Sequence, residues 1–233
     1  MANVLKRAVL GLMEKAFAKG LVLDVRKWDP HGMVELHLHL PDVDMSKWKT
    51  IQRLKCKVSE TDFEFRDYTP ARWDVEKRTC TMYIETSHKG WGAHWADNLQ
   101  AGDAILYGPA HEATPPNTPG KILCIGDGSA LGHCMAMRQL TNRHDFPMDT
   151  IIAWGEKYNV PDDLKTEHPE IEWIKSDHTE DFGLLYHEVE QKALQDYTSV
   201  FIAGNIPMVT GLRKMFKKNP YLQAKIVAHG FWK

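Results

Sequence analysis

The stretch Glu112-Ala-Thr-Pro-Pro-Asn-Thr-Pro-Gly120 separates two halves of the chain that differ in their hydrophobic pattern. Three prolines and one glycine in these nine residues can continue neither a helix nor a central strand. We therefore place a linker at residues 115–120 and expect one domain over 1–114 and a second over 121–233. A chain of 233 residues is long enough to build two small cores.

The half before the linker has the pattern of short strands. Residues 33–40 alternate strictly, with Val34, Leu36, Leu38 and Leu40 on one face. The other strands expected here lie at 20–27, 52–58, 62–69, 78–86 and 103–107, with turn residues between them. Several short strands at this spacing predict a small closed barrel. A short helix is expected at 92–99, where its free N-terminal N–H groups could face an anion.

The half after the linker alternates between apolar strands and helices. The expected strands lie at 121–125, 150–154, 171–174, 199–203 and 224–228, and the expected helices at 130–142, 184–195 and 207–218. This alternation predicts a parallel sheet with helices on its faces.

Composition narrows the class of protein. Hydrophobic residues make up 43% of the chain and the net charge is −2, so nothing indicates disorder or a nucleic-acid partner. No apolar run approaches the roughly 20 residues of a membrane span, and no signal-peptide pattern is present. We expect a cytoplasmic protein. A basic amphipathic helix over 2–19 could lie on a membrane, although packing on its own domain or on a second subunit is favoured.

The side chains that commonly bind metals form no recognisable set. Cys56, Cys80, Cys124 and Cys134 contain no C-x-x-C pair and lie in or beside apolar runs, so we expect buried reduced thiols. His37 and His39 share a strand face without a third ligand at a recognisable spacing, and we predict no protein-bound metal.

The segment Phe65-Arg-Asp-Tyr-Thr-Pro70 carries the clearest functional signal. The Arg66 guanidinium can fork onto a pyrophosphate, and the Tyr68 ring can stack on an isoalloxazine. The hydroxyl of Thr69 can hydrogen-bond the ring near the atom that accepts hydride. Taken alone, these residues could equally be a strand end with a surface arginine and a half-buried tyrosine.

The next segments along the chain support the functional interpretation. His88-Lys-Gly-Trp-Gly-Ala-His-Trp-Ala96 precedes Gly102-Asp103 and Gly108-Pro109. This order resembles the siderophore-interacting, ferric-siderophore-reductase branch of the ferredoxin-reductase-like flavoproteins. The resemblance implies a β-barrel FAD-binding domain and, after it, an α/β parallel-sheet domain of nucleotide-binding type. It also implies that Arg66 contacts the FAD phosphates and that Tyr68 contacts the flavin ring.

The resemblance extends the FAD site to His88, Gly92, Ala93 and Trp95. Glycine lets the backbone approach a phosphate closely. The sequence departs from the family pattern in a shorter loop, in a missing proline, and in His94, which stands where arginine is common. His88 could instead be a buried, hydrogen-bonded histidine.

The segment Gly126-Asp-Gly-Ser-Ala-Leu-Gly132 comes directly after the first strand of the second domain and opens a helix, a context that suits a dinucleotide. The spacing is not G-x-G-x-x-G, so a tight strand–helix turn is the alternative. The resemblance places Gly126, Asp127, Ser129 and Ala130 in the site. Gly132 replaces the family's proline, and Asn205 replaces a glutamate.

The resemblance also makes Trp232 a candidate lid over the flavin, with a packed terminus as the alternative. For a basic rim that would hold an anionic ferric chelate we name Arg72, Lys89 and Lys233. We expect Trp73 to serve packing. Lys157 and Lys175 are scattered candidates for a 2′-phosphate.

These patterns together favour an FAD-dependent reductase of ferric siderophores, in which NADPH or NADH reduces the flavin and the flavin reduces Fe(III). Two alternatives stay open. One is a flavin reductase or an electron-transfer flavoprotein fed by ferredoxin. The other is a protein that binds a ferric chelate or a flavin without turnover.

Overall fold

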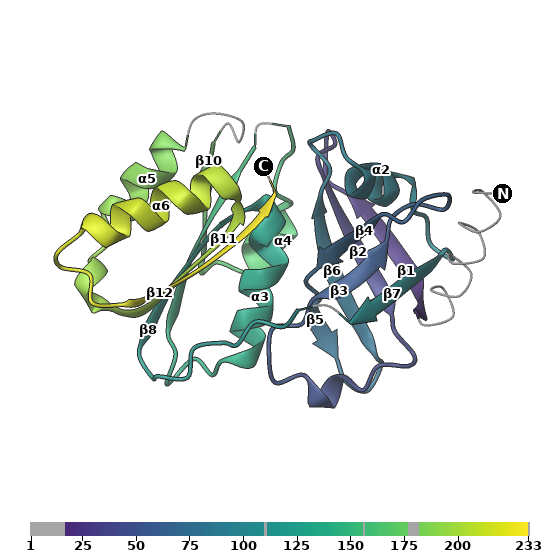
Figure 1. Cartoon of the computed structure of the whole chain (residues 1–233), viewed down its shortest axis with the longest axis horizontal. Helices are drawn as coiled ribbons and strands as arrows, with labels where there is room; N and C mark the ends of the chain where they lie inside the picture. Colours follow the sequence, from purple (N-terminus) through teal and green to yellow (C-terminus); the bar gives the residue numbers. More distant parts are fainter. Residues whose placement is uncertain (1–16, 110, 156, 177–181, 233) are drawn as a thin grey trace.

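A computed structural model describes residues 17–109, 111–155, 157–176 and 182–232 of the chain. Two sheets lie side by side, the antiparallel one formed by the first half of the chain and the parallel one by the second (Figure 1). The helix expected over 2–19 falls mostly outside the described residues. Its last two residues, Ala18 and Lys19, instead open a strand, because their backbone pairs with Tyr107 and Leu106.

The first sheet has seven strands in the order β4-β3-β7-β1-β2-β6-β5. Its edge strands β4 and β5 are separated by only Thr69 and Pro70, so the sheet must curl until its two edges approach each other. The strands are β1 (Ala18–Lys27), β2 (Met33–His39), β3 (Leu54–Lys57), β4 (Phe65–Tyr68), β5 (Ala71–Asp74), β6 (Thr79–Glu85) and β7 (Ala104–Pro109).

The six strands expected from the sequence are all present, and the alternation in β2 buries Val34, Leu36 and Leu38 inside the curled sheet. Strand β5 was not expected, because Arg72 and Asp74 break its apolar pattern. A short helix, α2 (Trp91–Asn98), comes after β6 as predicted, and a 3₁₀ turn, η1 (Met45–Lys47), connects β2 to β3.

The second sheet is fully parallel, with the order β10-β9-β8-β11-β12. Its strands are β8 (Lys121–Asp127), β9 (Met148–Trp154), β10 (Ile171–Lys175), β11 (Tyr197–Asn205) and β12 (Lys225–Trp232). Its helical segments are η2 (Gly128–Ala130), α3 (Leu131–Leu140), α4 (Asp162–Glu167), α5 (Gly183–Glu190), η3 (Leu194–Asp196) and α6 (Ile206–Lys218). Only the short α4 was not expected.

The helices divide between the two faces of this sheet. Helices α5 and α6 cover the outer face, and α3 lies on the face turned toward the curled sheet (Figure 1). The core beneath α3 is continuous across the two halves, since Trp28, Met33 and Tyr83 belong to the same buried cluster as Leu131 and Tyr158. None of the described helices is long and apolar enough to cross a membrane.

Polar contacts fix the two halves against each other at the rim of this core. The Arg26 guanidinium donates two hydrogen bonds of 2.6 Å to the Asp163 carboxylate at the start of α4. Lys157 donates to the carbonyl of Ser87 at 2.9 Å. The tip of the β1–β2 hairpin also reaches the second half, where Asn159 N–H donates to the carbonyl of Asp29.

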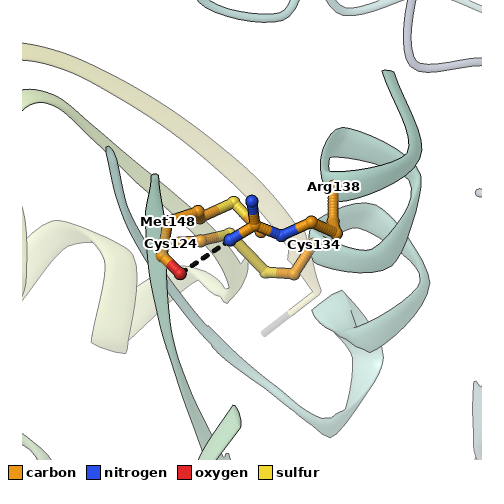
Figure 2. Close-up of a disulfide and its surroundings, with 4 residues drawn as sticks. All are labelled: Cys124, Cys134, Arg138 and Met148. Carbon is orange, nitrogen blue, oxygen red and sulfur yellow. Dashed lines mark hydrogen bonds between the residues drawn. A yellow bond between two sulfur atoms is a disulfide. The ribbon is translucent and has the colours of Figure 1, made fainter. Parts of the chain in front are cut away.

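Two of the four cysteines correct the sequence expectation. Cys124 of β8 and Cys134 of α3 form a disulfide, so these two are not free thiols (Figure 2). The tight turn between β8 and α3 brings residues ten apart in sequence face to face, with their α-carbons 6.3 Å apart. Cys56 and Cys80 are free and buried, as expected.

Helix α3 has a second attachment in the same region. Arg138 donates to the carbonyl oxygens of Met148 at 2.7 Å and Phe146 at 3.3 Å, next to the disulfide (Figure 2). The disulfide thereby attaches α3 to β8, and Arg138 attaches it to the start of β9.

Candidate cofactor cleft between the two domains

A cleft of about 350 Å³ lies where the ends of β3 and β4 face the β8–α3 turn and the end of β12. Both halves of the chain line it, and the predicted Arg66, Tyr68, Thr69 and Ser129 all belong to its wall. The lining residues are Arg53, Lys55, Phe65, Arg66, Asp67, Tyr68, Thr69, Tyr83, Ser129, Gly132, Gly230 and Phe231.

Tyr68 is held by α2 from the side opposite the cleft. Its ring stacks on Trp95 with 5.8 Å between centroids and 14° between planes. Its hydroxyl lies against Gly92, where a Cβ would be only 2.2 Å from the oxygen, so glycine is required at this position. Burial raises the pKa of Tyr68, which therefore remains a neutral phenol.

Arg66 lies beside the same turn of α2. Its Cγ is 3.3 Å from the position of a Cβ on Gly92, while its guanidinium reaches only Glu64 and the carbonyl of Phe65 within the described chain. The first turn of α2 has no side-chain cap at Gly90. An arginine side chain that passes beside uncapped helix N–H groups supplies the kinds of donor that a pyrophosphate needs, and these residues fit one.

Thr69 lies against the backbone of the second half of the chain. A Cβ on Gly132 would lie 2.8 Å from the Thr69 carbonyl oxygen. Gly132, one of the departures from the family pattern, is therefore explained by a backbone contact between the end of β4 and the start of α3. This contact closes one side of the cleft.

His88 and Trp232 meet at the edge of the cleft. Their rings pack edge to face with centroids 5.1 Å apart. The Trp232 indole N–H donates to Ser129 Oγ at 3.1 Å, which holds the end of β12 over the β8–α3 turn. His88 Nδ1 is buried and has no hydrogen-bond partner within the described chain, so a bound group could supply one.

The four predicted residues of the β8–α3 turn have different surroundings. Gly126 and Ala130 pack against each other, since a Cβ on Gly126 would lie 2.5 Å from that of Ala130. Asp127 is fully buried and points inward. Ser129 is the member of this group that lines the cleft.

Hydrogen bonds account for the position of Asp127. Its Oδ1 accepts from Ser129 N at 3.0 Å and from Ser129 Oγ at 2.5 Å, and its Oδ2 accepts from Asn205 N at 2.7 Å. Gly204, with φ of +122°, is needed here because a Cβ would lie 2.4 Å from Asp127 Oδ1. Asn205 caps α6, accepting from Met208 N at 3.1 Å.

The structure adds a buried residue that the sequence did not single out. Glu85 ends β6 and is 3% exposed. Burial and the nearby negative charge of Asp127 raise the pKa of Glu85 to about 8. In the sequence, the only indication was an acidic residue at the end of a strand that is otherwise largely apolar. Asp127, whose negative charge adds to the effect of burial on the pKa of Glu85, comes from the other half of the chain.

Of the three residues proposed for a basic rim, Arg72 and Lys89 lie outside the cleft lining. Arg72 has φ of +51° and donates to Glu167 at 2.9 Å beside a separate apolar hollow of about 170 Å³. Lys89 is exposed in the loop after β6, and Lys233 falls outside the described residues. The basic side chains of the cleft itself are Arg53, Lys55 and Arg66.

Other sequence candidates have structural roles. Trp73 packs against Trp48 with 5.3 Å between ring centroids, as expected for a packing residue. His94 is exposed, contacts Asn98 and lines a different hollow of about 520 Å³ beside α2. Lys175 lies over the Trp154 ring at the carboxyl end of the sheet.

Comparisons with known proteins support the fold. No protein-family model and no curated protein matches the chain. Among solved structures, a siderophore-interacting protein from Acinetobacter baumannii is similar, with 15% identity, TM-score 0.74, and coverage of 93% of this chain and 90% of that one. A siderophore utilization protein from T. fusca has 18% identity, TM-score 0.68, and coverage of 93% and 92%.

A third similar structure is phthalate dioxygenase reductase, with 16% identity and TM-score 0.71 over 94% of this chain and 69% of that one. At these identities the likeness concerns the fold. The chain has the ferredoxin-reductase-like fold, in which a curled antiparallel sheet precedes a parallel sheet with helices on both faces.

Proposed function

We propose that this chain is an FAD-dependent reductase of ferric siderophores that takes its electrons from NADPH or NADH. The observation that carries the proposal is the position of Arg66 and Tyr68 against the first turn of α2, at the wall of the interdomain cleft. The fold supports it, because similar solved structures are siderophore-interacting proteins and reductases.

Residues of the cleft lining and residues beside it would suit FAD in three ways. Arg66 and the N–H groups of Gly92 and Ala93 would hold the pyrophosphate. Tyr68 would offer a flat ring to the isoalloxazine, in a position fixed by Trp95. His88 Nδ1, without a partner of its own within the described chain, would gain one. When bound, FAD supplies the conversion of a two-electron hydride donor into single-electron steps.

A negatively charged ferric chelate would need positive charge at the cleft. Arg53 and Lys55 line it and are better placed than Arg72, which pairs with Glu167. Lys55 donates to Asp67 at 3.0 Å. Arg53 donates through Nε to the carbonyl of His111 at 2.9 Å, its one hydrogen bond to the residues that the structure describes. We propose Arg53 as the main electrostatic contact, with Lys89 and Lys233 as outer candidates.

Reduction would itself release the iron, since hard oxygen chelators hold Fe(III) far better than Fe(II). No protein ligand to iron is then required. Among the residues that the structure describes, no group of three or more histidine, cysteine or acidic side chains could hold a metal ion.

The first experiment is a visible absorption spectrum of the purified protein, with chromatographic identification of any released cofactor. The proposal expects about one FAD per chain. A colourless protein that also fails to take up added FAD would contradict it and would favour a non-catalytic binding protein.

The electron donor is decided by a second experiment. Asp127 and Asn205 are engaged in internal hydrogen bonds, which leaves Ser129 as the polar side chain of this turn in the cleft wall. This favours testing reduced ferredoxin beside the nucleotides. Stopped-flow reduction of the bound flavin by NADPH, NADH and reduced ferredoxin should show one clearly fastest donor, and capture of Fe(II) by a coloured chelator then tests the ferric substrate.

A further inference from the structure

Two buried carboxyl groups, one from each half of the chain, lie near enough to interact electrostatically. Glu85 ends β6 and Asp127 ends β8, and they are 3% and 0% exposed. Strand β6 lies against η2, the turn that begins directly after Asp127. Acidic side chains are seldom buried this completely, and two at one place interact strongly because water does not screen them.

The surroundings distribute the charge unequally between the two acids. Burial raises the pKa of Asp127. The hydrogen bonds that it accepts from Ser129 N, Ser129 Oγ and Asn205 N oppose this rise and favour its ionised form. Ser87 Oγ donates to Glu85 Oε1 at 3.2 Å. The pair therefore holds one proton at neutral pH, and that proton resides on Glu85.

Other groups that face the pair leave this assignment in place. Tyr158 is buried and its hydroxyl lies against Gly128. Burial and the charges of Glu85 and Asp127 raise the pKa of Tyr158, so it stays neutral. Lys157, which donates to the Ser87 carbonyl, acts in the opposite direction on Glu85 and is outweighed by burial.

Ser129 connects this pair to the cleft. Its Oγ donates to Asp127 Oδ1 at 2.5 Å and accepts from Trp232 Nε1 at 3.1 Å, and the residue itself lines the cleft. A hydroxyl can accept one proton while it donates another, so a proton arriving at Ser129 Oγ can leave toward Asp127.

We propose that Glu85 and Asp127 form a proton-exchange site for the redox chemistry of the cleft, with Ser129 carrying the proton between cleft and carboxylates. This inference rests on the proposed function. A hydride brings one proton and two electrons. When two Fe(III) ions each take one electron, the proton remains and must leave. As Ser129 Oγ accepts it, the Ser129 O–H bond breaks and a new O–H bond forms on Asp127 Oδ1. Loss of one proton from the pair to water restores the starting state.

The state of the pair can be tested without any cofactor. In the isolated protein, the infrared carbonyl band of a protonated carboxylic acid should be present at neutral pH and disappear with a midpoint of about 8. The band should be absent in Glu85→Gln. In Asp127→Asn its midpoint should fall, because the negative charge that opposes ionisation of Glu85 is gone.

The matched control is Glu35→Gln, which changes another partly buried acid in the neighbouring strand β2 and should leave the band intact. Circular dichroism confirms folding of each variant, and Glu85→Gln decides the outcome if Asp127→Asn does not fold. A band that is missing from the wild type, or that persists unchanged in Glu85→Gln, overturns the proposal.

The link to redox chemistry needs the loaded protein. Glu85→Gln should keep its FAD content but lower the rate of ferric reduction by roughly tenfold, and the solvent deuterium isotope effect should change because proton movement is slowed. Unchanged rate and isotope effect in both Glu85→Gln and Ser129→Ala would show a purely structural pair. If no FAD binds at all, the proposed function fails together with the redox role, while the infrared result still decides whether Glu85 holds the proton.

Discussion

The hydroxyl of Tyr68 lies against the backbone of Gly92. Strand β4, in which the R-x-Y-T segment (residues 66–69) begins, and the first turn of α2 therefore touch without room for a methyl group. The contact joins two segments that are more than twenty residues apart in sequence. It places the stem of the Arg66 side chain beside the first turn of α2, and the proposed FAD site depends on this arrangement.

Gly92→Ala should therefore impair FAD binding. The added Cβ would lie 2.2 Å from the Tyr68 oxygen, and relief of the clash must move either the ring or the helix. Overpacking of this kind costs about 1–3 kcal/mol, which corresponds to a loss of FAD affinity of roughly 5- to 150-fold, measured by fluorescence titration. The control is Gly90→Ala, because Gly90 has extended backbone and open space around its α-carbon. Equal affinities in the two variants would contradict the assignment.

Tyr68→Ala and Arg66→Ala test the same site from its side chains. Each should lower the flavin content of the purified protein, since the first removes the stacking surface and the second removes the charge beside α2. Flavin content is measured by absorbance after release of the cofactor. Unchanged content in both variants would remove the R-x-Y-T segment from the site.

Thr69→Val tests whether Thr69 affects the rate of flavin reduction independently of FAD affinity. The two side chains have nearly the same shape, so the close approach of the Thr69 carbonyl to Gly132 should survive. Loss of one hydroxyl should slow flavin reduction by about 3- to 10-fold, as expected for about 1 kcal/mol, while FAD affinity changes less. Stopped-flow reduction and equilibrium titration give the two numbers, and equal reduction rates would exclude Thr69 from the mechanism.

Much of the fold was accessible from the sequence because its signals are local. Alternation in β2 and the apolar runs of β8 and β11 are read within a few residues, and each of these strands is present. Strand β5 escaped detection because a strand with Arg72 and Asp74 is stabilised by pairing with β6, not by its own pattern. Helix α4 has six residues, too few to show a helical period.

The site residues likewise fall into those that a local sequence motif predicts and those that depend on tertiary contacts. Arg66, Tyr68, Thr69 and Ser129 were predicted, and the fold brings them to one cleft. No sequence motif includes Glu85 or Arg53, because the proposed role of each depends on neighbouring residues that only the tertiary structure brings close. The Cys124–Cys134 pairing was missed for the same reason, because cysteine spacing alone does not reveal which side chains of a strand and a helix face each other.

The disulfide makes a direct prediction about thiol content. Under denaturing, non-reducing conditions the protein should show two titratable thiols, Cys56 and Cys80, and four after reduction. Closing a loop of about ten residues is worth about 3 kcal/mol in chain entropy, so reduction should lower the free energy of unfolding by a similar amount. The double variant Cys124→Ala/Cys134→Ala serves as control, since a reductant should not change its stability. Four thiols before reduction would contradict the disulfide and would support the cytoplasmic location expected from the sequence.

His133 predicts how the protein responds to acid. The side chain is 1% exposed, and neither ring nitrogen has a hydrogen-bond partner in the described part of the chain. Burial, reinforced by His229 and the charge of Arg53, lowers the pKa of His133 to about 3. Below the ordinary histidine pKa of about 6.5, His133 binds a proton in the unfolded chain but stays neutral in the folded protein. The free energy of unfolding therefore falls as pH decreases from about 6.5 toward about 3.

The size of this loss of stability follows from the difference between the pKa of His133 in the folded protein and in the unfolded chain. Between neutral pH and pH 5 His133 alone should cost about 2 kcal/mol of unfolding free energy, and His133→Phe should remove that part of the pH dependence. Phenylalanine suits the site because Phe231 and His229 already pack there with ring centroids 5.8 and 5.6 Å away. Urea unfolding at several pH values measures the slope. His94→Gln, which changes an exposed histidine, should leave it nearly unchanged, and a wild-type slope retained in His133→Phe would show that His133 does not stay neutral in the folded state.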